Sequence, residues 1–207
     1  YKRQVLARFA SFEGDYQEAK RLCLSTLPVV QDLRDGRLEA TIYLELGRVM
    51  LATNELAEAI NILPVGAELA QEGNHWDMLN EIYILLGDVY LARKEYDASH
   101  RYYHRVLTLT QNIESVEYKV ICLEKLAVLR WVQDNTDLRP VQWLATTATW
   151  RQEANISLAP LDQAPLEQLL IAMKEQIAEQ EFDAAWQAGA LQSLAEALAT
   201  AVDTPPT

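Results

Sequence analysis

The amino-acid sequence predicts an all-α fold in which antiparallel helix pairs stack side by side as an α-solenoid. The first observation is composition: half of the 207 residues are hydrophobic, and the good helix formers Leu, Ala, Glu and Gln are the commonest types. The second is an internal repeat with a 40-residue period. Units of that length cannot bury their apolar faces alone, so they stack on one another.

A leucine followed by a small residue carries the repeat, at Leu6-Ala7, Leu46-Gly47, Leu86-Gly87 and Leu126-Ala127. A second small residue follows in the first three copies, at Ala19, Ala59 and Ser99, and the pattern fails at Arg139. Small residues in both helices of a pair let the two backbones approach closely. We expect polar turns at 13–16, 54–56 and 94–96. Residues 1–151 are therefore predicted to hold four helix pairs, the first truncated and the fourth degenerate.

The repeat resembles the tetratricopeptide pattern, aromatic-x-x-Leu-Gly-x-x-Tyr followed by Ala-x-x-x-aromatic. The chain has Tyr83-x-x-Leu86-Gly87-x-x-Tyr90, and then Ser99-x-x-x-Tyr103. It departs from that pattern in its 40-residue period and in lacking the closing Pro. The extra residues are expected to lengthen the second helix of each pair, which would place Pro28 and Pro64 inside helices.

This resemblance implies a right-handed superhelix in which the first helix of each pair lines the concave surface. Long repeats of this kind are similar to the MalT-like sensor regions of large bacterial signalling ATPases and of LuxR-type or SARP-type transcriptional regulators. Because the first residue is Tyr1 rather than Met, we expect the chain to be a piece of such a longer protein.

The C-terminal segment, 152–203, is predicted to form capping helices packed on the last repeat, with a disordered tail at 204–207. A loop is expected from Asn155 to Gln163 and a helix from near Pro165. Gly189 is expected to end the next helix, and the capping box at Ser193 to begin the last one. The spacing of Phe182, Trp186 and Gly189 resembles the C-terminal end of predicted ATPases with LuxR-type, SARP-type or cyclase partners, where these residues close the array.

The charge distribution argues against nucleic-acid binding by this chain. Net charge is −12, and from residue 152 onward nine acidic side chains accompany one basic one. Phosphate binding needs clustered Lys and Arg, which the chain lacks. The sequence contains neither a secretion signal nor an apolar stretch long enough to cross a membrane. Cys23 and Cys122 are interpreted as two buried thiols in a reducing cytoplasm.

No catalytic motif is apparent, so we expect no enzyme activity, no cofactor and no bound metal. Phosphate-binding loops, dinucleotide-binding turns and nucleophile elbows are absent from the sequence. His100 and His104 share a helix face, but Arg101 and Arg105 flank them and further ligands are not evident. The pair is therefore interpreted as partly exposed side chains on an outer helix.

Carrying the tetratricopeptide pattern over by position predicts a binding groove on the first helices. Its residues are Gln4, Arg8, Phe12, Thr41, Leu44, Arg48, Leu51, Glu81, Ile84, Asp88, Leu91, Ile121, Glu124, Val128 and Trp131. Arg8 and Arg48 occupy equivalent places and could clamp a carboxylate or phosphate. The favoured alternative is that they pair within the chain, with Glu45, Glu81 or Asp88. Trp131 either provides an aromatic contact surface for a ligand or packs against the C-terminal helices, and packing is favoured.

These observations favour a cytoplasmic regulatory domain that binds a protein, a peptide or a small metabolite in its groove. Binding would shift a larger signalling protein between two states. The alternative hypothesis is a scaffold that serves assembly or self-association without a small ligand. Catalysis is the weakest hypothesis, since no catalytic constellation is present.

Overall fold

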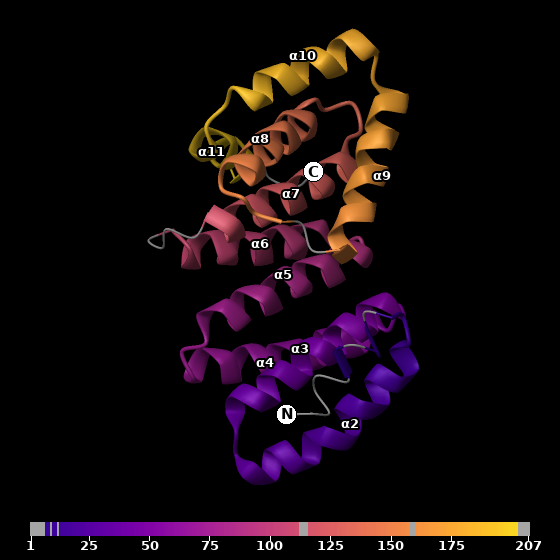
Figure 1. Cartoon of the computed structure of the whole chain (residues 1–207), viewed down its shortest axis with the longest axis vertical. Helices are drawn as coiled ribbons and strands as arrows, with labels where there is room; N and C mark the ends of the chain where they lie inside the picture. The colour runs from indigo at the N-terminus through magenta and orange to yellow at the C-terminus, as the bar shows by residue number, and fades with distance from the viewer. Residues whose placement is uncertain (1–6, 9, 12, 112–115, 158–159, 203–207) are drawn as a thin grey trace. The chain divides into compact units, whose positions relative to one another are not determined.

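A computed structural model describes residues 7–8, 10–11, 13–111, 116–157 and 160–202 of the chain (Figure 1). The predicted tail at 204–207 lies outside them. The regular elements in these ranges are all helices, which confirms the all-α prediction. They are α2 Tyr16–Leu33, α3 Gly36–Ala52, α4 Leu56–Glu72, α5 Trp76–Ala92, α6 Tyr96–Leu109, α7 Val116–Gln133, α8 Arg139–Glu153, α9 Pro160–Gln176, α10 Glu179–Ala190 and α11 Leu194–Val202.

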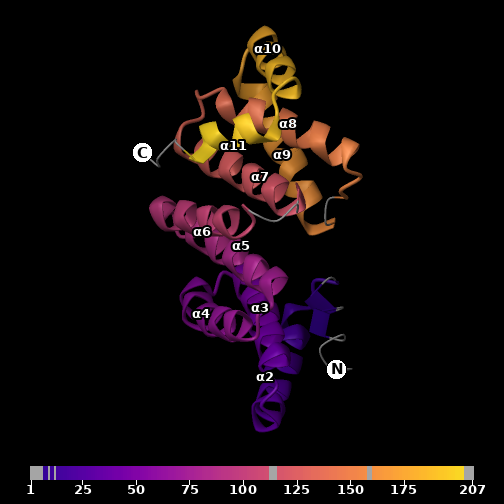
Figure 2. The ribbon, with the colours of Figure 1, turned by 90° about the vertical axis from the view of Figure 1, so that its left-hand side faces the viewer.

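The chain divides into two compact units, Tyr1–Tyr102 and Tyr103–Thr207, and the division falls inside α6. In the first unit α2 packs on α3, α3 on α4 and α4 on α5 (Figure 2). In the second, α7 packs on α8, which also carries α10 and α11. The boundary that we expected at 151 marks where the sequence pattern ends, and it stays a prediction.

The helices begin at a regular 20-residue interval, which explains the 40-residue period of the sequence. Six successive helices, α2 to α7, start at Tyr16, Gly36, Leu56, Trp76, Tyr96 and Val116. One helix with its turn thus makes up half of the sequence repeat, and a helix pair makes up the whole of it. Pro28 lies inside α2 and Pro64 inside α4, as predicted.

The same backbone turn precedes each of the helices α2 to α6. A left-handed residue recurs at the same 20-residue interval, at Gly14, Arg34, Asn54, Asn74 and Lys94. At the α3–α4 turn, the Glu55 amide donates to the Met50 carbonyl at 2.7 Å and the Asn54 amide to Leu51 at 3.2 Å. This is the Schellman pattern, which satisfies the last carbonyls of the helix. The turns expected at 13–16, 54–56 and 94–96 are confirmed.

The next residue then opens the following helix, so one short turn both ends and begins a helix. The Asp15 side chain accepts from the Glu18 amide at 3.1 Å, and Asp35 accepts from the Leu38 amide at 3.0 Å. Both are N-caps of the helix that follows. The chain therefore reverses direction within a very short segment, and neighbouring helices are antiparallel.

Close packing inside a pair depends on the small residues of the repeat. A Cβ atom added at Gly47 of α3 would overlap a methyl of Leu63 on α4 and lie 2.9 Å from the Leu63 Cγ. Ala59, the small partner on α4, is fully buried, as is Leu63. The predicted close approach is confirmed at Gly47, where a side chain would force the neighbouring leucine to shift.

The 20-residue interval between helix starts is lost at α8, and a turn of charged residues precedes this helix. α8 begins at Arg139, later than the Thr136 position that the 20-residue interval from α7 would give it. Asp137 accepts from the Arg130 Nε at 2.6 Å and from the Arg139 Nη2 at 2.5 Å. Burial alone would raise the pKa of Asp137, but hydrogen bonds from Arg139 and Arg130 outweigh it and hold this pKa at about 2. The position where the sequence pattern fails, Arg139, thus belongs to this ion-pair network.

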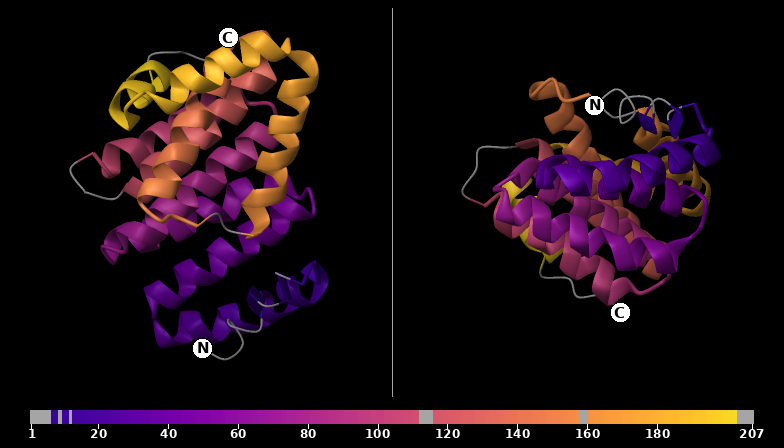
Figure 3. Two further views of the ribbon diagram at one scale, coloured as in Figure 1. Left: turned by 45° about the horizontal axis from the view of Figure 1, so that its top comes forward. Right: turned by 90° about the horizontal axis from the view of Figure 1, so that it is seen from below.

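The C-terminal helices correct two predictions. The helix expected from near Pro165 begins earlier, at Pro160, and Pro165 lies inside it. A proline at the first helical position costs little because its missing N–H has no intrahelical partner there. Gly189 lies within α10 rather than ending it, and a Cβ there would overlap the Gln142 carbonyl oxygen of α8 and lie 2.6 Å from the Gln142 Cα. Its role is the close approach of α10 to α8 (Figure 3, left).

One other C-terminal prediction, the capping box, holds. Ser193 and Glu196 form the expected capping box: the Ser193 amide donates to Glu196 Oε2 at 3.0 Å, and the Glu196 amide donates to Ser193 Oγ at 3.3 Å. Phe182 is buried and stacks on Trp186, with ring centroids 5.8 Å apart. Both cysteines are buried thiols outside any disulfide, as expected.

Substitution of Gly47 by Ala tests the packing within a pair. We expect Gly47→Ala to lower the free energy of unfolding by about 1–3 kcal/mol, because the added methyl displaces Leu63. Gly36→Ala is the matched control, since its Cβ would meet only a Leu69 methyl at 3.7 Å. Urea unfolding followed by circular dichroism measures both. Equal effects of the two substitutions would contradict the packing argument.

Candidate functional site

Most of the predicted groove residues lie on three first helices, α3, α5 and α7. Gln4 and Phe12 lie outside the described residues, and Arg8 is exposed. In the first unit, α3 carries Thr41, Leu44, Arg48 and Leu51, and α5 carries Glu81, Ile84, Asp88 and Leu91. These two helices contact each other. Ile121, Glu124, Val128 and Trp131 lie on α7 in the second unit and are described separately.

Arg48 joins α3 to α5 through two carboxylates. Its Nη1 lies 2.5 Å from Glu45 Oε1, one turn earlier on α3, and its Nη2 lies 2.5 Å from Glu81 Oε2 on α5. The Glu45 side chain is only 6% exposed, whereas that of Arg48 is 31% exposed. Intramolecular pairing, the favoured alternative for this arginine, is therefore confirmed.

This pairing changes what the surface can bind. Each donor nitrogen at the end of the Arg48 guanidinium already faces a carboxylate, so an anionic ligand would have to displace Glu45 or Glu81. Among the predicted groove positions of α3 and α5, Glu81 and Asp88 stand against Arg48, which leaves a balance of one negative charge. A surface of this charge favours neutral or cationic partners over anions.

Aliphatic side chains lie between the charged ones on the same helix faces. Leu51, Ile84 and Leu91 are partly exposed, while Leu44 is buried. On α5 the sequence positions 81, 84, 88 and 91 follow helical spacing, so Glu81, Ile84, Asp88 and Leu91 form one mixed stripe. We call the described side chains of α3 and α5 in this set the α3–α5 surface. Such a mixture is typical of protein-binding surfaces rather than of metabolite sites.

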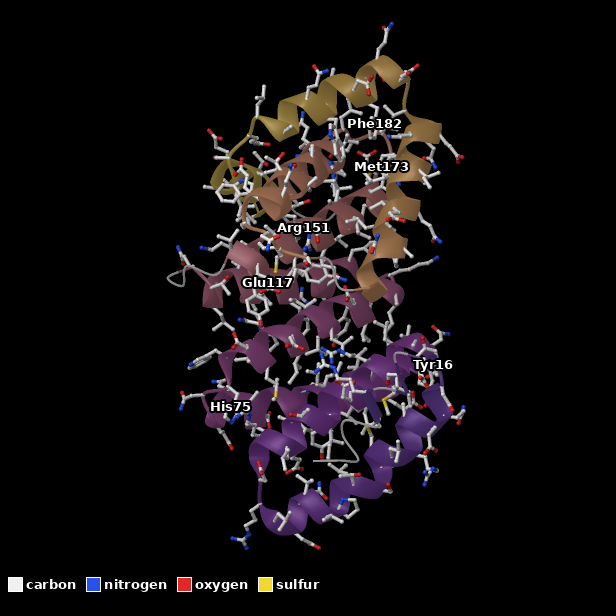
Figure 4. The ribbon with its side chains drawn as sticks, in the orientation of Figure 1. Tyr16, His75, Glu117, Arg151, Met173 and Phe182 are labelled. Atoms are coloured by element: carbon white, nitrogen blue, oxygen red, sulfur yellow. The ribbon has the colours of Figure 1, made fainter. Side chains whose placement is uncertain are left out.

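In the second unit, the groove position Glu124 is neutralised from α8. The Arg151 guanidinium binds it in a bidentate pair, Nε to Oε1 at 2.6 Å and Nη2 to Oε2 at 2.7 Å. Arg151, labelled in Figure 4, also donates to the Ser157 carbonyl at 3.3 Å, beyond the end of α8. Trp131 is 6% exposed, which supports packing rather than a ligand-binding floor.

Arg151 was missed by the sequence argument, because 27 residues separate it from Glu124. A basic residue in the last turn of a helix normally reads as a favourable charge for the helix dipole. Only the tertiary packing of α7 against α8 reveals its partner.

Metal-binding and membrane-spanning features are absent from the described part of the chain. These residues contain no group of three or more His, Cys, Asp or Glu side chains arranged to hold a metal ion. His100 is partly exposed and His104 is exposed. Within the same residues, no helix has the length and apolar character needed to span a bilayer.

No protein-family model fits the chain, and no curated protein is significantly similar to it in sequence.

Removing Arg48 tests whether the buried Glu45 depends on it. We expect Arg48→Met to lower the free energy of unfolding by about 2–4 kcal/mol, because a buried carboxylate loses its partner. The double variant Glu45→Leu/Arg48→Met should recover most of that loss. Thermal and urea unfolding at neutral pH measure both.

The matched control is Arg21→Met, which breaks a pair of the same spacing at the surface. Glu18 and Arg21 are 39% and 65% exposed, so we expect no measurable change. If Arg48→Met were as harmless as this control, Glu45 would not depend on Arg48.

Proposed function

We propose that this chain is a non-catalytic regulatory domain that binds a protein or peptide partner on its first helices. It would be a right-handed superhelix of the tetratricopeptide type. The observation that carries the proposal is the 20-residue interval at which six helices begin. Regular helix pairs of this kind present equivalent positions of successive first helices on one binding surface.

The α3–α5 surface supports a protein or peptide over an anionic metabolite. Its only described arginine, Arg48, is held by Glu45 and Glu81. Its partly exposed aliphatic residues suit an apolar side chain of a partner, and its negative balance suits a neutral or basic segment. In the second unit Arg151 neutralises Glu124, so that groove position favours neither a cation nor an anion.

The biological setting that we propose follows from the family resemblance. The chain would be the sensor or interaction region of a larger bacterial signalling ATPase or transcriptional regulator, acting in the cytoplasm. Partner binding would shift the parent protein between inactive and active states in proportion to its differential affinity for them.

A scaffold that self-associates is the second candidate, and the exposed apolar side chains of α2 favour it. Leu24, Val29 and Leu33 are 49%, 53% and 69% exposed. Light scattering distinguishes the two. A monomer at high concentration would count against self-association and leave the regulatory proposal standing.

Charge reversal on α5 tests the proposed surface. The chain is immobilised, a bacterial extract is passed over it, and each captured protein is quantified by mass spectrometry. We expect Glu81→Lys/Asp88→Lys to reduce capture of the specific partner at least tenfold, since it reverses the charge of the surface. The matched control is Glu58→Lys/Glu68→Lys, which makes the same change at exposed positions of α4. Equal loss with both pairs would reject the α3–α5 surface.

A further inference from the structure

A depression at the turns of the first unit has features that packing does not explain. It has a volume of about 610 Å³ and lies where the α2–α3 turn meets the α4–α5 turn. Leu33 at the end of α2, Leu69 on α4 and Gly36 at the start of α3 contribute apolar lining, and charged side chains surround them. His75, labelled in Figure 4, lies at its α4–α5 side. The α3–α5 surface contributes no residue to it.

Gly36 keeps the depression open although the fold does not require a glycine there. Its φ is not positive, and a Cβ would meet only a Leu69 methyl at 3.7 Å, an ordinary contact. One repeat later the equivalent position is Trp76, whose side chain is large. Glycine is favoured where a ligand approaches the backbone closely, and Gly36 leaves room for such an approach.

Two arginines at the rim have no partner within the described part of the chain. Arg34 and Arg37 both line the depression, and their side chains make no ion pair or hydrogen bond there. The nearby Asp35 carboxylate is engaged, since it accepts from the Leu38 amide as the N-cap of α3. The two guanidinium groups are therefore available to an external carboxylate, which they bind in planar, bidentate geometry.

The aliphatic lining is available as well. Leu33 is 69% exposed, and among the described leucines only Leu191 is more exposed. Leu69 is partly exposed on the facing helix. Burying such side chains against an aliphatic group stabilises binding, because apolar surface is removed from water.

We propose that this depression binds a monocarboxylate with an aliphatic tail. Arg34 and Arg37 would hold the carboxylate, and the tail would lie over Gly36 between Leu33 and Leu69. Glu72, at the α4 side of the rim, disfavours a second negative charge on the ligand. A peptide ending in leucine and a free medium-chain fatty acid share this chemistry, and the site is separate from the α3–α5 surface.

Chemical-shift mapping on the isotopically labelled full chain tests the site directly. The probes are the peptide acetyl-Ala-Ala-Leu-Leu with a free C-terminal acid, the same peptide as its amide, and octanoate. We expect at least one acid to shift the backbone amide signals of Gly36 and Gly73 in a saturable manner. The amide should bind at least tenfold more weakly than the acid peptide. Whichever acid binds more tightly identifies the source.

Two variants distinguish binding in the depression from general electrostatic attraction of the anion to the chain. Arg34→Gln/Arg37→Gln should weaken the acid at least tenfold, and Gly36→Trp should abolish binding by filling the depression as Trp76 does one repeat later. The matched control Lys94→Gln/Arg101→Gln removes the same charge elsewhere in the first unit and should leave affinity unchanged. Absence of saturable shifts with either acid, equal binding of the amide, or equal loss with the control would overturn the proposal.

Discussion

The structure depends on one backbone turn used again and again. In the turns before α2 to α6 a residue with positive φ is followed by the residue that opens the next helix. The left-handed conformation turns the two amides at the turn back to the last carbonyls, which would otherwise lack partners. With the helix length fixed between such turns, helices recur at a 20-residue interval and pairs at a 40-residue interval. The side-chain repeat of the sequence is the consequence of this backbone interval.

Small residues allow the helices that these turns connect to pack closely against each other. Gly47 admits the side chain of Leu63, and Gly189 admits the backbone of α8 at Gln142. The same requirement thus appears in a repeat pair and in the C-terminal helices. Where the interval is lost, before α8, Asp137 and two arginines form the turn instead. Charge pairing there replaces the left-handed residue that the first unit uses.

The sequence revealed what is local or periodic and missed what depends on distant partners. Helix type, the polar turns, the helical prolines and the capping box at Ser193 follow from spacing and local hydrogen bonding. The pairing of Arg48 was also anticipated, because Glu45 lies one helical turn away. The start of α9 at Pro160 was missed because two prolines each permit a first turn. Gly189 was assigned to a helix end because its contact with Gln142 joins two helices that are far apart in the sequence. Arg151 and the depression beside Gly36 likewise arise from packing between separate helices.

Glycine substitution at the left-handed positions tests most directly whether one turn geometry recurs at a 20-residue interval. Arg34 and Lys94 adopt φ of 53° and 62° without being glycine. Such a backbone costs a side-chain-bearing residue about 1 kcal/mol more than it costs glycine. Urea unfolding should therefore show Arg34→Gly and Lys94→Gly each raising the free energy of unfolding by about 0.5–1 kcal/mol. A decrease of about 1 kcal/mol, as expected for glycine inside a helix, would contradict the account.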